Sequence, residues 1–140
     1  MHIIVCVDDR MGMLFNHRRQ SRDRVLTEYL LKRAEGHTLY MSPFSEKLLG
    51  AKSGTTVSPD FLREAQPGDY CFVEDQPLSP WEDAMESLIL CRWNRAYPGD
   101  FFLDLDLKNW QKAEACEFPG SSHDKITVET YLKRKGGAAE

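Results

Sequence analysis

The chain has 140 residues, of which 41% are hydrophobic and 29% are charged, and these values fit one globular domain rather than a disordered chain. No apolar run approaches the roughly 20 residues that a membrane-spanning helix needs, and no leader sequence precedes the first apolar run, so we expect a cytoplasmic protein with no membrane partner. The net charge of −4 argues against nucleic acid as a partner.

Strand and helix patterns alternate in the first half of the chain. The apolar, β-branched run 3–7 predicts a central strand that is covered on both faces. Apolar residues at helical spacing predict a helix over 25–34, which Ser21 or Asp23 caps, and a polar loop over 16–24 leads into it. Further strands are expected at 38–41, 70–73 and 88–93, and further helices at 42–49 and 58–65.

The last third of the chain is rich in strand-forming residues. The segment 111–118 alternates loosely, and 125–133 carries Ile, Thr and Val in alternation. Ser121-Ser122 would also suit the start of a helix, but the alternation favours a strand. The order of elements predicts an α/β fold with a mostly parallel central sheet, an antiparallel C-terminal hairpin and flanking helices. We expect a single domain over 1–134 and a flexible tail over 135–140.

Several short segments resemble dihydrofolate reductases, in the order in which that family has them. Gly99-Asp-Phe-Phe102, followed by Trp110, is similar to the family's Gly-Asp-Thr-Phe-Phe-Pro…Trp segment. Gly36-His-Thr-Leu-Tyr-Met41 and Thr127-Val-Glu-Thr-Tyr131 resemble two of its strand segments. The resemblance spans nearly the whole chain and implies a dihydrofolate reductase-like fold.

The cofactor-binding segments depart from that family's pattern. The family binds the cofactor phosphates through a Gly-Arg-x-Thr motif, and a Gly-Gly pair lets its backbone approach the pyrophosphate. This chain has Ser42-Pro-Phe-Ser45 at the first place and Val73-Glu-Asp-Gln76 at the second. Proline lacks an amide donor and two carboxylates repel a phosphate, so the resemblance implies the fold without the cofactor fingerprints.

The resemblance offers two positions for the family's catalytic carboxylate, which begins the first long helix. Counting without gaps puts Leu26 at that place, whereas a shift of three residues brings in Asp23. Asp23 is therefore the candidate catalytic residue, because a carboxylate in an apolar cleft can manage proton delivery. The alternative is that Asp23 only caps the helix. Cys91 stands where the family has the Thr that supports the acid.

Four arginines lie close together just before the predicted helix. In the resembling fold this segment borders the substrate cleft, where guanidinium groups can bind a phosphate or a carboxylate bidentately. The alternative is a solvated loop with a salt bridge at a strand end. We expect a small anionic or nucleotide-like ligand to contact Arg18, Arg19, Arg22, Arg24, Cys91 and Arg92.

The sequence offers little for metal binding or hydrolysis. The four histidines are isolated, so no metal site is predicted, and Asp8-Asp9 is interpreted as a polar turn, with a Mg²⁺ site as the alternative. Gly120-Ser-Ser-His123 is interpreted as a turn, with an anion nest or a nucleophile as the alternative, because the chain has no Gly-x-Ser-x-Gly elbow. The chain also resembles small uncharacterised bacterial proteins, some labelled ribonuclease Z, but the His-x-His-x-Asp-His motif of that enzyme is absent.

Three functions stay open. We predict first a dihydrofolate reductase-like protein that has lost the cofactor fingerprints and binds a small anionic or nucleotide-like ligand. The second is an NADPH-dependent reductase with atypical cofactor contacts and Asp23 as its acid. The third is a protein-interaction module with a vestigial cleft. Fold alone does not choose among them.

Overall fold

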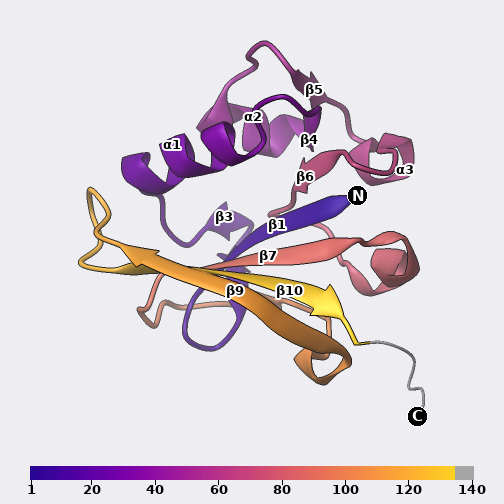
Figure 1. Ribbon diagram of the computed structural model, residues 1–140. Helices are drawn as coiled ribbons and strands as arrows, with labels where there is room; N and C mark the ends of the chain where they lie inside the picture. Colours follow the sequence, from indigo (N-terminus) through magenta and orange to yellow (C-terminus); the bar gives the residue numbers. More distant parts are fainter. Residues whose placement is uncertain (135–140) are drawn as a thin grey trace.

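A seven-stranded sheet forms the centre of the computed structural model, which describes residues 1–134; the tail expected at 135–140 lies outside the described residues. The strand order is β5-β4-β6-β1-β7-β10-β9 (Figure 1). The first five run parallel, β10 is antiparallel to β7, and β9 is antiparallel to β10, which confirms the predicted α/β sheet. The strands are β1 (His2–Val7), β4 (Leu39–Met41), β5 (Thr55–Val57), β6 (Tyr70–Phe72), β7 (Ser87–Arg92), β9 (Trp110–Phe118) and β10 (Ile126–Lys133).

β1 lies in the middle of the sheet because its side chains are apolar on both faces. Ile3, Val5 and Val7 are buried in one hydrophobic cluster, and Ile4 is buried in the cluster on the opposite face. β1 pairs in parallel with β6 on one side and with β7 on the other. A strand covered on both faces reads as a continuous apolar run, and β1 has that pattern.

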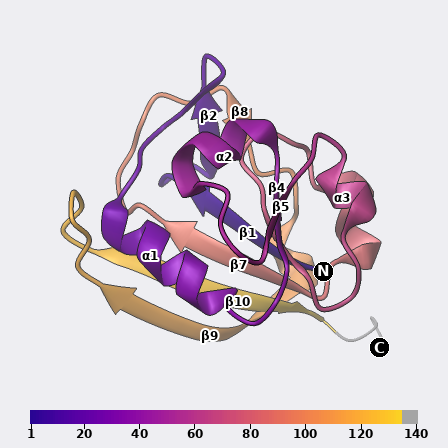
Figure 2. The same ribbon diagram turned by 90° about the horizontal axis from the view of Figure 1, so that it is seen from above.

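Two helices cover the face that carries the candidate site. α1 (Arg24–Arg33) and α2 (Pro43–Leu49) lie on the same side of the sheet (Figure 1). Seen from above, α1 crosses over β7 and β10 (Figure 2). Leu26 and Leu30 of α1 pack in one cluster with Ile89 of β7, so the apolar stripe of the helix faces the sheet.

The opposite face is covered by shorter elements. α3 (Phe61–Glu64) and the 3-10 helix η1 (Ser79–Ala84) pack there, and Phe61 shares a buried cluster with Trp110. A second 3-10 helix, η2 (Leu107–Asn109), leads into β9. The helix expected over 58–65 is shorter than predicted, since it begins only after Asp60, whose side chain makes no capping hydrogen bond.

A second, three-stranded sheet in the order β3-β2-β8 holds the arginine segment. β2 (Gly12–Phe15) pairs antiparallel with β3 (Arg18–Arg19) and with β8 (Phe101–Phe102). The polar loop expected over 16–24 therefore contains a strand, because a tight turn at 16–17 returns the chain onto β2. The pairing turns Arg18 to solvent and leaves Arg19 half-buried.

The C-terminal segment is the strand that its alternation favoured. Ile126 and Val128 are buried on the α1 face of β10, which pairs with β7 on one side and β9 on the other. Within residues 1–134, no helix is long and apolar enough to cross a membrane.

Candidate functional site

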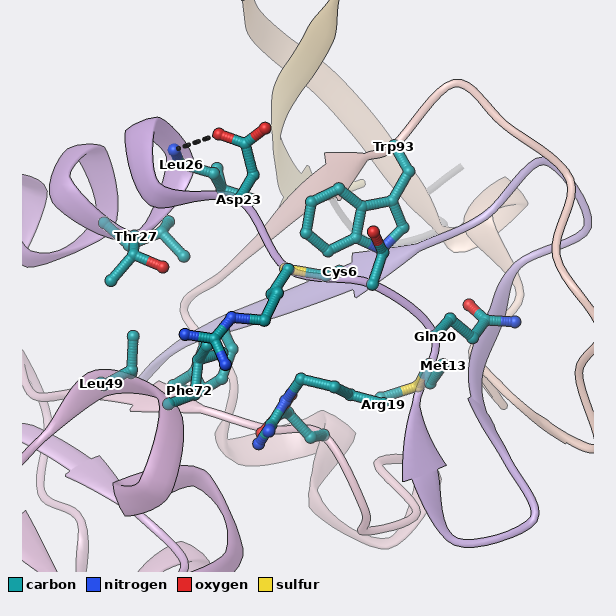
Figure 3. A pocket seen from close by; sticks show the side chains of 15 residues that line it. Cys6, Met13, Arg19, Gln20, Asp23, Leu26, Thr27, Leu49, Phe72 and Trp93 are labelled. Atoms are coloured by element: carbon teal, nitrogen blue, oxygen red, sulfur yellow. Dashed lines mark hydrogen bonds and ion pairs between the residues drawn. The ribbon is translucent and has the colours of Figure 1, made fainter. Parts of the chain in front are cut away.

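A small enclosed cavity lies between α1 and α2, at the carboxyl ends of β1, β6 and β7 (Figure 3). Open α/β sheets bind ligands in this position. The cavity has a volume of about 20 Å³, which is room for little more than one water molecule. We call it the inner cavity; it is lined by Cys6, Met13, Arg19, Gln20, Ser21, Arg22, Asp23, Leu26, Thr27, Leu30, Leu48, Leu49, Phe72, Glu74 and Trp93.

A wider depression, which we call the outer groove, continues from the inner cavity over the start of α1. Its volume is about 500 Å³, within the range of pockets that hold small molecules. It runs between α1, the end of α2 and the loop that joins β9 to β10. Five residues line both spaces, so the two adjoin each other: Arg22, Asp23, Thr27, Leu48 and Leu49.

Three cationic side chains line the outer groove. Arg22 and Arg24 flank the start of α1, and Lys52 follows α2. Arg24 lies 3.5 Å from Glu28, but both side chains are well exposed (71% and 64%), so water screens this pair. No ion pair among residues 1–134 involves Arg22 or Lys52. Asp23 and Glu28 also line the groove, but three cations against two carboxylates leave it net positive, so an anion gains favourable electrostatic energy there.

Arg19 is held inside the molecule by Glu74, which follows β6. Its Nε and Nη2 donate hydrogen bonds of 2.8 Å to the two carboxylate oxygens of Glu74. Ser45 Oγ donates a further 2.8 Å bond to Glu74, and the guanidinium lies 4.7 Å from the ring centre of Phe44. The hydrogen bond to Glu74 raises the pKa of Arg19, against the opposing effect of burial. Arg19 is thus already paired.

Asp75 adds a second carboxylate beside Glu74. Burial raises the pKa of Asp75, and the negative charge of Glu74 raises it further. Both carboxyl groups lie where β6 meets the start of α2, and α2 begins with Pro43, which has no amide hydrogen to donate. This corner of the site therefore holds two carboxyl groups, Glu74 and Asp75, and one guanidinium, Arg19, which is paired with Glu74.

Asp23 caps α1 and also holds the loop between β9 and β10. Figure 3 shows its carboxylate turned toward the Leu26 amide at the start of the helix. Its oxygens accept hydrogen bonds from the backbone amides of Val25, Leu26, Ser121 and Ser122 and from His123 Nδ1.

Burial would raise the pKa of Asp23, but the hydrogen bonds it accepts, from the Ser122 amide and His123 foremost, hold the pKa well below the ordinary 3.8. An ionised carboxylate with these partners has no proton to deliver to a ligand. The geometry therefore favours the capping role over proton donation. Leu26, the other position considered for the acid, is an apolar residue of the cavity wall.

His123 connects Asp23 to the wall of the inner cavity. Its Nδ1 lies 2.9 Å from Asp23 Oδ2, and its Nε2 lies 2.9 Å from Ser21 Oγ and 3.0 Å from the hydroxyl oxygen of Tyr97. The imidazole is almost fully buried and stacks on Trp93, with 4.6 Å between ring centres. Three distant segments of the chain thereby form one hydrogen-bonded chain.

The structure separates the other expected ligand contacts from this site. Cys91 is fully buried beside Cys6, its register partner on β1, and only Cys6 lines the inner cavity. Arg92 is the next residue on β7 and so points to the opposite face, where it donates a 2.7 Å hydrogen bond to Glu129. Arg18 is exposed and lines neither space.

Asp8 forms a turn rather than a ligand shell. Its carboxylate accepts hydrogen bonds from the backbone amides of Arg10, Gly12 and Tyr97. No group of three His, Cys, Asp or Glu side chains within residues 1–134 is arranged to hold a metal ion.

Ser21, Tyr97 and His123 were not among the expected site residues. They are 76 and 26 positions apart along the chain, so no spacing rule links them. Ser121-Ser122 was interpreted as a turn or a helix start, whereas its amides bind Asp23. The only hint of these contacts in the sequence was the cluster of polar residues at 121–123.

No family model matches the chain, and no curated protein matches it. Among solved structures, it is similar to the dihydrofolate reductase from Enterococcus faecalis complexed with NADP(H) and RAB-propyl, with a TM-score of 0.68. The likeness covers 95% of each chain at 13% sequence identity. The chain therefore has a dihydrofolate reductase-like fold, which confirms the resemblance at the level of the fold.

Proposed function

We propose that this protein uses a dihydrofolate reductase-like fold to bind a small anionic ligand that also carries an apolar group. The observation that supports this most directly is the outer groove, where Arg22, Arg24 and Lys52 surround a space that adjoins the inner cavity. The anionic group lies among these three cations. The apolar group enters toward Leu26, Leu49 and Phe72 of the inner cavity.

Binding requires a small opening of the inner cavity. Its 20 Å³ are too few for an aromatic ring, whereas the 500 Å³ of the outer groove suit a small molecule. Arg22 lines both spaces and is exposed, so its side chain can move at low cost when a ligand enters. Arg22 is thus the residue that we propose reorients on binding.

NADP(H), with which the similar dihydrofolate reductase is complexed, does not fit the residues that this chain has beside β6. Glu74 is paired with Arg19 and Ser45, and Asp75 stands next to it. A dinucleotide phosphate there would meet two carboxyl groups and would have to compete with Glu74 for the guanidinium of Arg19. We therefore propose that the ligand is not a nicotinamide dinucleotide, which leaves the reductase alternative without support from this part of the site.

The state of the cysteines bears on where the protein acts. All four are free, and Cys71 and Cys91 are buried in the sheet as small apolar residues. Free thiols fit a reducing compartment. We propose the cytoplasm as the location.

Thermal unfolding in the presence of phenyl phosphate, inorganic phosphate or NADPH tests the proposal. Phenyl phosphate at 100 times its dissociation constant should stabilise the fold by about 2.7 kcal/mol. We expect it to act at lower concentration than inorganic phosphate, and NADPH to act no better than inorganic phosphate.

Arginine variants locate the effect. Arg22→Ala combined with Arg24→Ala should abolish the stabilisation by phenyl phosphate, whereas Arg63→Ala, on α3 at the opposite face, should leave it unchanged. Equal stabilisation of all three proteins, or a response to NADPH alone, would refute the proposal. If none of the three compounds stabilises the wild type, the interaction-module alternative is favoured instead.

A further inference from the structure

We propose that Ser21, His123 and Asp23 form a hydrolytic triad in which Ser21 attacks the carbonyl carbon of a small ester. This activity goes beyond ligand binding. The hydrogen bonds that support it do not involve the arginines of the outer groove. Ser21 Oγ lies 2.9 Å from His123 Nε2, and His123 Nδ1 lies 2.9 Å from Asp23 Oδ2. Nucleophile, base and orienting carboxylate need this order.

The hydrogen bonds assign the proton of the imidazole. An ionised carboxylate can only accept, so the 2.9 Å contact between Asp23 Oδ2 and His123 Nδ1 requires a proton on Nδ1. In the neutral ring, Nε2 is then the acceptor, and it faces two hydroxyl groups, Ser21 Oγ at 2.9 Å and Tyr97 at 3.0 Å. His123 is therefore in the tautomer that can remove the hydroxyl proton of Ser21.

The surroundings fix the imidazole in this orientation. His123 is 4% exposed, and the indole of Trp93 stacks on its ring. The four backbone amides that hold Asp23 keep the carboxylate in place. A base held by buried partners needs no rearrangement when the reaction starts.

Tyr97 supplies a hydrogen-bond donor next to the nucleophile. Its hydroxyl oxygen lies 3.3 Å from Ser21 Oγ. The oxygen of a tetrahedral intermediate forms on the carbon that is bonded to Ser21 Oγ, so it lies within reach of the Tyr97 hydroxyl. Tyr97 is thus the residue that donates to the developing oxyanion.

The reaction balances with an ester and water. Ser21 Oγ bonds to the carbonyl carbon while its proton passes to His123 Nε2; the C–O bond of the ester then breaks, and the leaving alcohol takes that proton. Water attacks the acyl group on Ser21 and gives a proton to His123. Release of the carboxylic acid returns the proton to Ser21.

The shape of the site points to the class of substrate. Ser21 lines the inner cavity, whose 20 Å³ hold little more than one water molecule, so an acyl group enters only when the cavity opens, and a short one needs the smallest opening. The adjoining outer groove carries Arg22, Arg24 and Lys52, which favour a negative charge on the alcohol part. The expected substrate is a short-chain ester of an anionic alcohol.

Hydrolysis of 4-nitrophenyl acetate by the full chain tests the triad. The wild type should act at least 20-fold faster than Ser21→Ala, and His123→Asn should be as slow as Ser21→Ala. His123→Asn keeps an amide donor for Asp23, so its fold should persist. Ser53→Ala and His17→Gln, both exposed and outside these contacts, should keep the wild-type rate. A wild type no faster than Ser21→Ala would overturn the proposal.

Covalent labelling gives a readout that does not depend on turnover. A fluorophosphonate ester should add to Ser21 of the wild type, located by peptide mass mapping, and His123→Asn should lose the label. Labelling at another serine, or none at pH 8, would contradict the role of Ser21 as the nucleophile.

Asp23 touches His123 and not the substrate, so it is a positioning residue. Asp23 and Tyr97 are the titratable groups among residues 1–134 that hydrogen-bond to the His123 ring. Asp23→Asn removes the acceptor that holds the proton on His123 Nδ1, so it should lower kcat with little change in KM and should slow the labelling of Ser21 by the fluorophosphonate. A labelling rate equal to that of the wild type would show that Asp23 only supports the fold.

Discussion

Glu74 shows how one residue changes what a site can bind. Its carboxylate takes up both donor atoms of the Arg19 fork and the hydroxyl of Ser45. The segment 73–76 was predicted to repel a phosphate, and the structure adds that Glu74 also withdraws an arginine from any ligand. The sequence could not have predicted this pairing, because Arg19 and Glu74 lie 55 positions apart.

Glu74→Ala should destabilise the protein by about 2–3 kcal/mol, since it leaves the half-buried Arg19 charge without its carboxylate, with only the Phe44 carbonyl and ring as partners. Urea unfolding measures the change. Glu28→Ala, which removes an exposed i,i+4 pair, is the matched control and should cost less than about 0.5 kcal/mol. Arg19→Met combined with Glu74→Leu should recover most of the loss; if it does not, burial of the pair is not the source of the effect.

Asp23 makes the stability depend on acid pH. Its folded-state pKa lies below the ordinary 3.8, so its contribution is complete well above 3.8 and is lost as the pH falls through that value toward the folded-state pKa. Asp23→Asn should be about 2 kcal/mol less stable than the wild type at pH 7. Urea unfolding at a series of pH values should show this difference shrinking below pH 4. A difference that stays constant down to pH 2 would contradict the account.

At the scale of elements, hydrogen bonds join the start of α1 to the loop between β9 and β10, and we call this set of hydrogen bonds the clasp. Asp23 accepts the amides of Ser121 and Ser122, and Arg24 N donates to Ser121 Oγ. The clasp closes one end of the outer groove. The sequence predicted α1 and both strands but gave no sign that they were joined, because each partner alone resembles an ordinary helix cap or turn.

Gly120 is the residue that lets this clasp close. A Cβ built on it would lie under 3.0 Å from three atoms of the Asp23 carboxyl group. Gly120→Ala should therefore destabilise the fold by about 1–3 kcal/mol, measured by urea unfolding. In an Asp23→Ala background the space is free, so the added cost of Gly120→Ala should fall close to zero. The same cost in both backgrounds would place the strain elsewhere.

The elements that sequence patterns predicted well have a clear local signal. β1 and β7 are continuous apolar runs, α1 and β10 have apolar residues at helical or alternating spacing, and α2 begins with a Ser-Pro cap. The short strands β2, β3 and β8 escaped prediction because tertiary pairing, and not composition, makes two to four residues extended. The strand at 18–19 matters most for the site, since it directs Arg19 inward and Arg18 outward.

At the scale of the molecule, the order of elements was enough to predict the fold. Several short segments in the right order pointed to a dihydrofolate reductase-like architecture, and the structural likeness at 13% identity confirms it. The site was harder to predict because its chemistry comes from contacts between distant segments. Of the expected site residues, Arg19, Arg22 and Asp23 line the inner cavity and Arg24 lines the outer groove. Three others line neither space: Arg18, Cys91 and Arg92.

The most direct test of the account is a map of amide ¹H–¹⁵N chemical shifts during titration with phenyl phosphate and, separately, with NADPH. Phenyl phosphate should move the resonances of Arg22, Arg24, Thr27 and Lys52 around the outer groove, and NADPH should leave those of 42–45 and 73–76 in place. Saturable shifts at 42–45 and 73–76 with NADPH would contradict the account and identify a nicotinamide-binding protein.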